Sequence, residues 1–184
     1  MRLLETTLPG PILIQPVVHG DERGFFLESY RRNVFAQLGV TEELVQHNHS
    51  RSRRGVVRGM HFQPGMGKLV RCVRGSIVDV LVDIRRGSPT FGQWEAFELN
   101  DSTHHQLYAP DGFGHGFCVL SEIADVTYGC TTYYDSETEA GFRYNDPEVG
   151  IQWPDGVELT PSARDAAAPL LSELADSLPF EYAR

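Results

Sequence analysis

The amino-acid sequence predicts an all-β fold, a β-sandwich or barrel, on three observations. Strand-length segments rich in Val, Ile, Leu and Phe recur along the 184 residues. Gly, Pro, Asn and Asp separate these segments at the short intervals that are typical of sandwiches and barrels. Helix signals are scarce. Because the hydrophobic content is 41% and the composition does not shift along the chain, we expect residues 1–184 to form one domain with its own core.

The expected strands follow in chain order from apolar runs that turn residues bound on both sides. They are residues 11–15, 24–28, 56–61, 68–73, 77–84, 94–99, 106–109, 117–120 and 126–134. A short amphipathic helix is expected over 31–38, because Val34, Phe35 and Leu38 would share one face. A second helix is expected to begin after Ser162, with Ser162 as its N-cap and Asp165 at the third helical position.

The expected strand 77–84 carries two acids in an apolar setting. Its period-two alternation places Asp79 and Asp83 on one face, together with Ile77 and Leu81. Acids on such a face indicate a polar cavity. The same pattern also fits an edge strand with one wet face, and the sequence leaves both interpretations open.

The distribution of charge argues for a small anionic ligand and against nucleic acid. The formal net charge is −9, whereas nucleic-acid-binding proteins usually carry a basic footprint. One segment departs from this balance, because it contains basic residues and no Asp or Glu: Arg51, Arg53, Arg54, Arg58, Lys68, Arg71 and Arg74. This local excess favours an anionic small substrate, although a solvated charged face gives the same pattern.

Cysteine usage and the N-terminal segment indicate a cytoplasmic location. The three cysteines have no CxxC spacing, and their odd number argues against a disulfide framework, so a reducing compartment is expected. No apolar run approaches the roughly 18 residues that span a bilayer. Glu5 follows Met1 too closely for the apolar region of a secretory signal peptide.

His61 is the candidate for acid–base chemistry. It lies between Arg58 and Lys68 at strand-like spacing, and a tyrosine-rich run that includes Tyr128 and Tyr134 follows downstream. A neutral imidazole can accept a proton, an ammonium can stabilise the resulting oxyanion, and a phenol can return a proton. This combination suits proton abstraction from a carbon next to a carbonyl. A structural histidine and core tyrosines are the alternatives that each residue leaves open on its own.

Short motifs occur in a characteristic order along nearly the whole chain. They are Asp21-Glu22-Arg23-Gly24-Phe25-Phe26-Leu27-Glu28, Gln46-His47-Asn48-His49-Ser50, Arg58-Gly59-Met60-His61-Phe62-Gln63, Gly67-Lys68-Leu69-Val70-Arg71, residues 79–85, Ser88-Pro89-Thr90-Phe91-Gly92, Pro110-Asp111-Gly112-Phe113-Gly114-His115-Gly116-Phe117 and Trp153-Pro154. In these motifs the sequence resembles the dTDP-4-dehydrorhamnose 3,5-epimerases and their sugar-nucleotide epimerase relatives. The resemblance implies a cupin-type β-jelly roll with a few short helices, a homodimer, and no cofactor or metal.

The resemblance also implies a reaction. It is the inversion of C3, C5 or both in a nucleotide-diphospho-4-keto-6-deoxysugar, with dTDP-4-dehydro-6-deoxyglucose converted to dTDP-4-dehydrorhamnose. By position, His61 is similar to the family's base, Tyr128 to its acid, Lys68 to the lysine beside the keto oxygen, and Asp165 to the aspartate that orients the base. Contacts with the diphosphate and nucleotide are implied for Arg23, Glu28, Gln46, Asn48, Arg58, His115, Glu139 and Arg164, with Tyr134 stacking on the nucleotide base.

Three alternatives remain at this stage. His47, His49 and His115 are a plausible ligand set for a metal-dependent cupin, but arginines and serines stand where a carboxylate ligand is expected after the first pair. A non-catalytic sugar-nucleotide-binding module would keep the arginines without requiring the acid–base residues. A single-site epimerase or keto-isomerase of the same fold is the third, because His47 and the short segment 62–68 depart from the family pattern.

Overall fold

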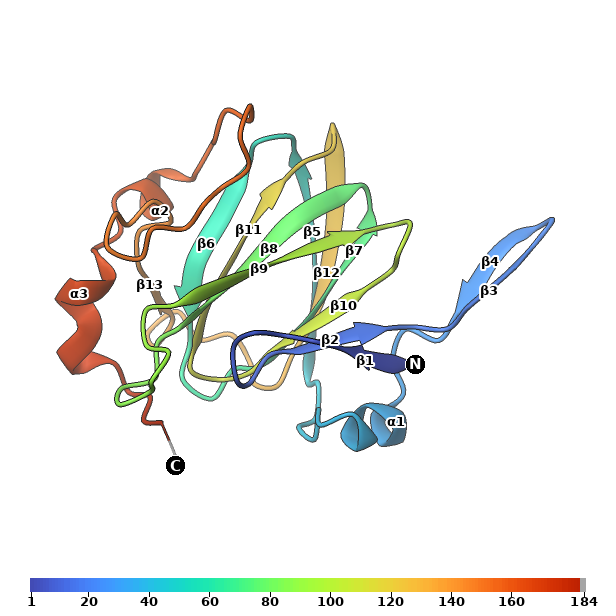
Figure 1. Ribbon diagram of the computed structural model, residues 1–184, viewed down its shortest axis with the longest axis horizontal. Helices are drawn as coiled ribbons and strands as arrows, with labels where there is room; N and C mark the ends of the chain where they lie inside the picture. Colours follow the sequence, from blue (N-terminus) through green and yellow to red (C-terminus); the bar gives the residue numbers. More distant parts are fainter. Residues whose placement is uncertain (183–184) are drawn as a thin grey trace.

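The computed structural model describes residues 1–182, and its two larger sheets are antiparallel throughout. The six-stranded sheet has the order β1 (Arg2–Leu4), β2 (Ile12–Gln15), β10 (Gln106–Ala109), β7 (Lys68–Arg74), β12 (Ile123–Cys130) and β5 (Gln46–Arg53). The five-stranded sheet has the order β13 (Ala140–Gly141), β6 (Val57–Phe62), β11 (Phe113–Val119), β8 (Ser76–Asp83) and β9 (Trp94–Asn100). Figure 1 shows the two sheets packed as layers, which confirms the expected β-jelly roll.

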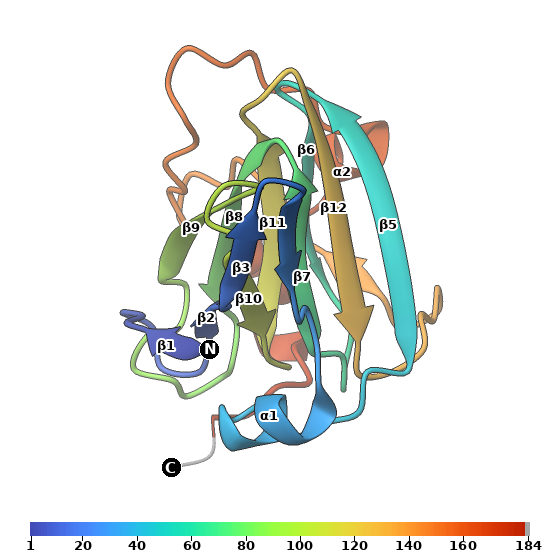
Figure 2. The same cartoon turned by 90° about the vertical axis from the view of Figure 1, so that its right-hand side faces the viewer.

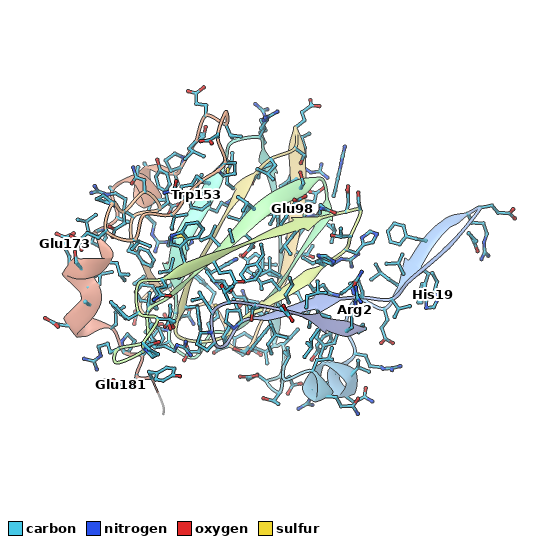
Figure 3. The ribbon with its side chains drawn as sticks, viewed as in Figure 1. Arg2, His19, Glu98, Trp153, Glu173 and Glu181 are labelled. Carbon is cyan, nitrogen blue, oxygen red and sulfur yellow. The ribbon has the colours of Figure 1, made fainter. Side chains whose placement is uncertain are left out.

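The main core fills the space between the two sheets. Val70 and Val126 from the six-stranded sheet meet Leu81 and Phe117 from the five-stranded sheet in one buried cluster. Figure 3 shows side chains filling this space, whereas His19 stands apart from it. Because strand residues alternate between faces, each strand sends every second side chain into this layer.

A second cluster lies on the outer face of the five-stranded sheet. There the C-terminal segment, with α2 (Ala163–Ala166), α3 (Leu171–Leu174) and the 3-10 turn η1 (Ala175–Ser177), covers the sheet in Figure 1. Val80 and Val82 pack on this side against Leu171 and Phe180. Strand β8 is therefore buried on both faces and pairs with a neighbour on each side, so the edge-strand interpretation of residues 77–84 is wrong.

Helix α1 (Arg32–Gln37) and a hairpin lie outside the two-sheet body. Phe35 of α1 packs against Ile14 and Leu69 on the outer face of the six-stranded sheet. The hairpin of β3 (Val18–Asp21) and β4 (Gly24–Leu27) extends away from the body in Figure 1, lies in front of the sheets in the turned view of Figure 2, and exposes the rings of Phe25 and Phe26. Within residues 1–182, no helix is long and apolar enough to cross a membrane.

Several strand boundaries differ from the expected ones for packing reasons. β11 begins at Phe113 rather than residue 117, because its glycines allow close contacts rather than forming a turn: a Cβ at Gly116 would lie 2.7 Å from the Met60 sulfur. β12 ends at Cys130, before the expected residue 134, and the Thr131 amide donates to the Gly67 carbonyl. The sequence patterns also missed β1, β3, β5 and β13.

Strand β5 shows why a polar segment can escape detection. It is the edge strand of its sheet and pairs along its full length with β12. Its sequence is QHNHSRSR, which lacks the β-branched and aromatic residues that signal a strand. Pairing with β12 supplies what local propensity does not, and Ser50 of this polar strand reaches the main cavity.

Candidate active site

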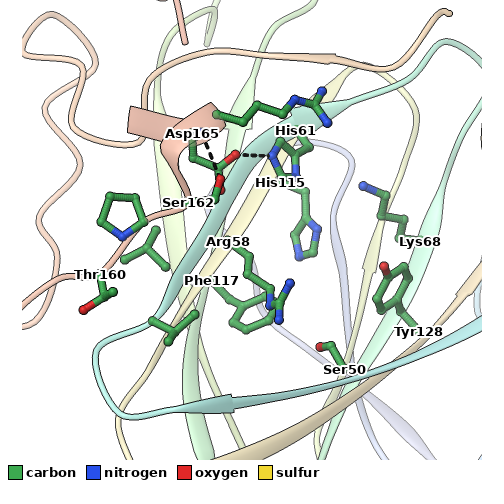
Figure 4. Close-up of a pocket in the computed structure, with 14 residues that line it drawn as sticks. Ser50, Arg58, His61, Lys68, His115, Phe117, Tyr128, Thr160, Ser162 and Asp165 are labelled. Carbon is green, nitrogen blue, oxygen red and sulfur yellow. Dashed lines mark hydrogen bonds and ion pairs between the residues drawn. The ribbon is translucent and has the colours of Figure 1, made fainter. Parts of the chain in front are cut away.

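A cavity of about 500 Å³ opens between the two sheets. Strands β5, β6, β7, β11 and β12 contribute its walls, and the segment before and within α2 closes one side. The lining residues are Ser50, Val56, Val57, Arg58, His61, Lys68, His115, Phe117, Tyr128, Thr160, Pro161, Ser162, Arg164 and Asp165. Figure 4 shows His61 and Asp165 on one side of this cavity and Lys68 and Tyr128 on the other.

His61 and Asp165 form the central hydrogen bond of the site. The Nε2–H of His61 donates to Oδ1 of Asp165 over 2.7 Å. Asp165 is buried, and its backbone amide donates to the hydroxyl of Ser162, the N-cap of α2, over 3.0 Å. The expected N-cap and the expected position of Asp165 are thus confirmed. With Nε2 protonated, the neutral imidazole keeps a lone pair on Nδ1, which makes Nδ1 the proton acceptor.

Lys68 and Tyr128 come from adjacent strands. Tyr128 pairs with Val70 and Cys130 with Lys68, so Lys68 and Tyr128 occupy diagonal positions on the inner face of the sheet. Burial lowers the pKa of the Lys68 ammonium below its ordinary 10.5, and the nearby Cys130, Glu139 and Asp79 oppose this shift. Burial is also the main cause of the raised pKa of the Tyr128 phenol. The phenol therefore keeps its proton at neutral pH.

A second buried histidine–aspartate pair lies at the base of the cavity. His115 on β11 and Asp79 on β8 are held by strand pairing, and Nε2 of His115 lies 3.0 Å from both carboxylate oxygens of Asp79. His115 lines the cavity, whereas Asp79 is fully buried and is not part of the cavity wall. Asp83 instead accepts hydrogen bonds from Arg85, Ser88 and Thr90 at the far end of the strand.

The electrostatic character of the cavity favours an anionic ligand. Three cationic side chains line the cavity, those of Arg58, Lys68 and Arg164. Among the described residues that line it, Asp165 alone carries a carboxylate. The Arg58 side chain is oriented by Ser52, to which its Nε–H donates over 3.0 Å. Guanidinium groups that remain partly open to the cavity match the geometry of phosphate oxygens.

The other expected contact residues lie outside the cavity wall. Gln46 donates to Asn48 over 3.1 Å, and Asn48 contacts the sulfur of Cys130. Tyr134 is exposed. Arg23 pairs with Asp21 at the end of the projecting hairpin, and Glu28 pairs with Arg31 beyond it. Glu139 lies beside His61, with Oε1 4.0 Å from Nδ1, and forms an ion pair with Arg164.

The sequence patterns missed several residues that shape the site. Thr160 and Pro161 enter the wall because the Thr160 amide donates to the Gly55 carbonyl and the Val57 amide donates to the Thr160 carbonyl. Gln63 is buried and holds the segment that leads to Glu139, donating to the Tyr133 carbonyl and accepting from the Asp135 amide, each over 2.9 Å. Its position two residues after His61 is the signal that could have identified it.

The three histidines of the metal-site alternative are not brought together. His49 lies on the outer face of its sheet, 3.1 Å from Asp125, and His47 lines a separate small cavity. His115 lies in the main cavity, on the inner side. Within residues 1–182, no three His, Cys, Asp or Glu side chains are arranged so that they could hold a metal ion.

Comparisons with known proteins agree with this geometry. The family model of dTDP-4-dehydrorhamnose 3,5-epimerase matches residues 5–173. The dTDP-4-dehydrorhamnose 3,5-epimerase of Salmonella typhimurium is 48% identical over 177 residues, covering 94% of this chain and 97% of that protein. The dTDP-4-dehydrorhamnose 3-epimerase of Streptomyces niveus is 45% identical over 181 residues, covering 96% of this chain and 87% of that protein.

The solved structures show the same relationship in three dimensions. The crystal structure of dTDP-6-deoxy-D-glucose-3,5-epimerase from Legionella pneumophila, in complex with dTDP-4-keto-L-rhamnose, is 44% identical and superposes with a TM-score of 0.95. The superposition covers 100% of this chain and 99% of that one. Sequence and fold therefore lead to one conclusion: this chain belongs to the dTDP-4-dehydrorhamnose 3,5-epimerase family.

Proposed function

We propose that this protein inverts C3 and C5 of a dTDP-linked 4-keto-6-deoxysugar, converting dTDP-4-dehydro-6-deoxyglucose to dTDP-4-dehydrorhamnose. The observation that carries the proposal is the position of the His61–Asp165 pair across the cavity from Lys68 and Tyr128. A base and an acid on opposite sides of one ligand can remove a proton from one face of a carbon and return a proton to the other. Inversion by two separate acid–base groups requires this arrangement.

The proposed chemistry assigns one task to each group. Nδ1 of His61 takes the proton from the carbon next to the ketone, and the electrons of the C–H bond move into an enolate. The Lys68 ammonium donates a hydrogen bond to the enolate oxygen, in a site where burial strengthens electrostatic interactions. The Tyr128 hydroxyl then gives its proton to the opposite face of the carbon. Asp165 stabilises the imidazolium that forms, as the aspartate of a hydrolase triad does.

The positive groups of the cavity support a nucleotide-diphospho sugar as substrate. Arg58 and Arg164 are available for the diphosphate at the cavity wall. The Legionella pneumophila relative was solved with dTDP-4-keto-L-rhamnose, and this fits a keto sugar placed between His61 and Lys68. A cavity of about 500 Å³ is in the range of small-molecule sites.

We also propose a homodimer in which each hairpin completes the partner's site. Arg23 and Glu28, expected substrate contacts, lie on or beside a hairpin that extends away from its own body. The exposed rings of Phe25 and Phe26 give this hairpin an apolar surface for a second copy.

Mixed dimers test this arrangement. His61→Asn and Arg23→Ala homodimers should both be weakly active, and mixing their subunits should restore activity, because one site then combines an intact His61 with an intact hairpin. Failure of the mixture to recover activity would argue against the shared site.

Incubation with dTDP-4-dehydro-6-deoxyglucose in D2O tests the reaction itself. We expect NMR to locate deuterium at C3 and C5 and to detect the inverted product, with both signals lost in His61→Asn. Deuterium at C3 alone would instead assign a 3-epimerase, the activity named for the Streptomyces niveus relative. Absence of exchange at both carbons in a folded protein that binds dTDP would refute the proposal.

A further inference from the structure

Glu139 and Arg164 form an ion pair on the Nδ1 side of the candidate base. One oxygen of Glu139 lies 4.0 Å from Nδ1 of His61, and the other is bound by Arg164. The opposite nitrogen of the imidazole, Nε2, is already occupied by Asp165. Nδ1, which must accept the substrate proton, therefore faces a second carboxylate whose charge is compensated by a guanidinium.

The two members of this pair differ in their freedom to change partners. The Arg164 side chain is 58% exposed and lines the cavity, whereas the Glu139 side chain is 11% exposed and does not contribute to the cavity wall. The Glu139 amide donates to the Asp135 carbonyl over 2.9 Å, and the next residue, Ala140, pairs with Phe62 in the sheet. Glu139 is thus fixed beside the base, while Arg164 can turn toward a ligand.

Glu139 also acts on the other catalytic groups. Hydrogen bonding to Glu139 is the main cause of the raised pKa of Arg164. The charge of Glu139 opposes the lowering of the Lys68 pKa by burial and contributes to the raised pKa of the Tyr128 phenol. The Glu139 carboxylate is therefore within electrostatic range of the base, the acid and the oxyanion-binding lysine. If Glu139 changes its ion-pair partner, its electrostatic interaction with all three groups changes.

We propose that Arg164 passes from Glu139 to the diphosphate of the bound substrate, and that Glu139 then pairs with the Nδ1 side of His61. This rests on the proposed function, because a diphosphate is the group that competes for Arg164. The transfer leaves Glu139 uncompensated when the substrate is present, so the base becomes a stronger proton acceptor only in the complex. The proton moves from the sugar carbon to Nδ1, and Glu139 stabilises the imidazolium. Glu139 is in this sense a positioning residue that acts through His61.

The titration of His61 depends on every charged or titratable group around it, not on Glu139 alone. Arg58 lies on its own strand β6, His115 on β11, Lys68 on β7 and Tyr128 on β12, while Arg164 and Asp165 lie on α2. A fixed set of charges shifts the titration by the same amount with and without a ligand, apart from the charge of the ligand itself. The transfer of Arg164 from Glu139 to the ligand has a different consequence. It makes the ligand-induced change in the titration of His61 depend on the presence of the Glu139 carboxylate.

NMR titration of the imidazole tests the proposal without requiring turnover. The His61 signal, assigned by its absence in His61→Asn, is followed with pH in the free enzyme and with saturating dTDP as the diphosphate probe. We expect dTDP to raise the titration midpoint by about one pH unit in the wild type, and by clearly less in Glu139→Gln, given the Coulomb interaction expected at about 4 Å near a protein surface. Glu139→Asp, which retains the charge, should recover most of the response.

The matched control is Glu137→Gln, which removes an exposed carboxylate from the same segment. It should behave as the wild type in both titrations. An equal dTDP-induced change in wild type and Glu139→Gln would overturn the partner exchange, and so would a Glu137→Gln effect as large as that of Glu139→Gln. The titration uses dTDP, which is not turned over, so its result does not depend on epimerase activity. A protein without epimerase activity would contradict the proposed function, whatever the titration shows.

Discussion

The substitution Asp165→Asn tests the central hydrogen bond of the proposed mechanism. In the structure Asp165 accepts from Nε2–H of His61 over 2.7 Å and is buried, so the bond is short, charge-assisted and shielded from water. Asparagine has nearly the same shape. Its amide can donate to Nε2 instead, and this places the imidazole proton on Nδ1, the nitrogen that must be free to accept the substrate proton.

The magnitude follows from two contributions. A hydrogen bond to a charged group stabilises by about 1.5–3 kcal/mol, which corresponds to a loss of roughly tenfold to 150-fold in rate. A wrong tautomer costs more, because the equivalent substitution in a hydrolase triad lowers kcat about 10⁴-fold. We therefore expect Asp165→Asn to reduce kcat by about 10² to 10⁴, with a much smaller change in dTDP affinity.

The assay measures solvent-deuterium exchange and product formation under substrate saturation, with dTDP binding and thermal unfolding measured in parallel. Ser162→Ala separates orientation of the base from simple support of the helix. It removes the hydroxyl that caps α2 and should cost about 1 kcal/mol of stability while reducing the rate by less than about tenfold. If Asp165→Asn retained more than about a tenth of wild-type kcat, the tautomer argument would be refuted and another group would have to orient His61.

Further predictions concern the acid, the lysine, metals and a buried thiol. Tyr128→Phe should exchange substrate protons with D2O faster than it forms inverted product, since His61 can return a proton only to the face it came from; undiminished inversion would identify another acid. Activity should fall as pH rises through the lowered pKa of Lys68, because the neutral amine cannot stabilise the enolate, and Lys68→Arg should move this fall to higher pH in a kcat profile. Dialysis against EDTA should leave activity intact, and activity that returns only with added metal would contradict the role of Lys68. Burial raises the pKa of the Cys72 thiol to about 11 from 9.0, so above about pH 9 only the unfolded thiol ionises and the free energy of unfolding should decrease toward pH 11. In urea unfolding, Cys72→Val should show a smaller decrease over this range.

The strands with apolar patterns were the part of the fold that the sequence could predict. Residues 106–109 form a strand with the expected bounds, and β2, β6, β7 and β8 lie within one or two residues of expectation. In these segments, burial and backbone preference act in the same direction. Where they did not, prediction failed: β5 is polar because it forms an edge, and β11 contains glycines because Met60 and Phe142 pack against its backbone. Such causes lie in other parts of the chain.

The candidate site divides in the same way. The motif around His61 and Lys68 determined which acid–base chemistry is available, because that chemistry depends only on the functional groups of its residues. The tertiary structure decided how these groups act: it brings Asp165 to Nε2 from 104 positions away, leaves Nδ1 free, and places Glu139 and Arg164 beside it. It also places Arg23 in the turn of the β3–β4 hairpin, which extends away from the rest of the chain in Figure 1. Strand pairing and loop packing between distant segments fix these distances, and a linear sequence pattern carries no direct record of them.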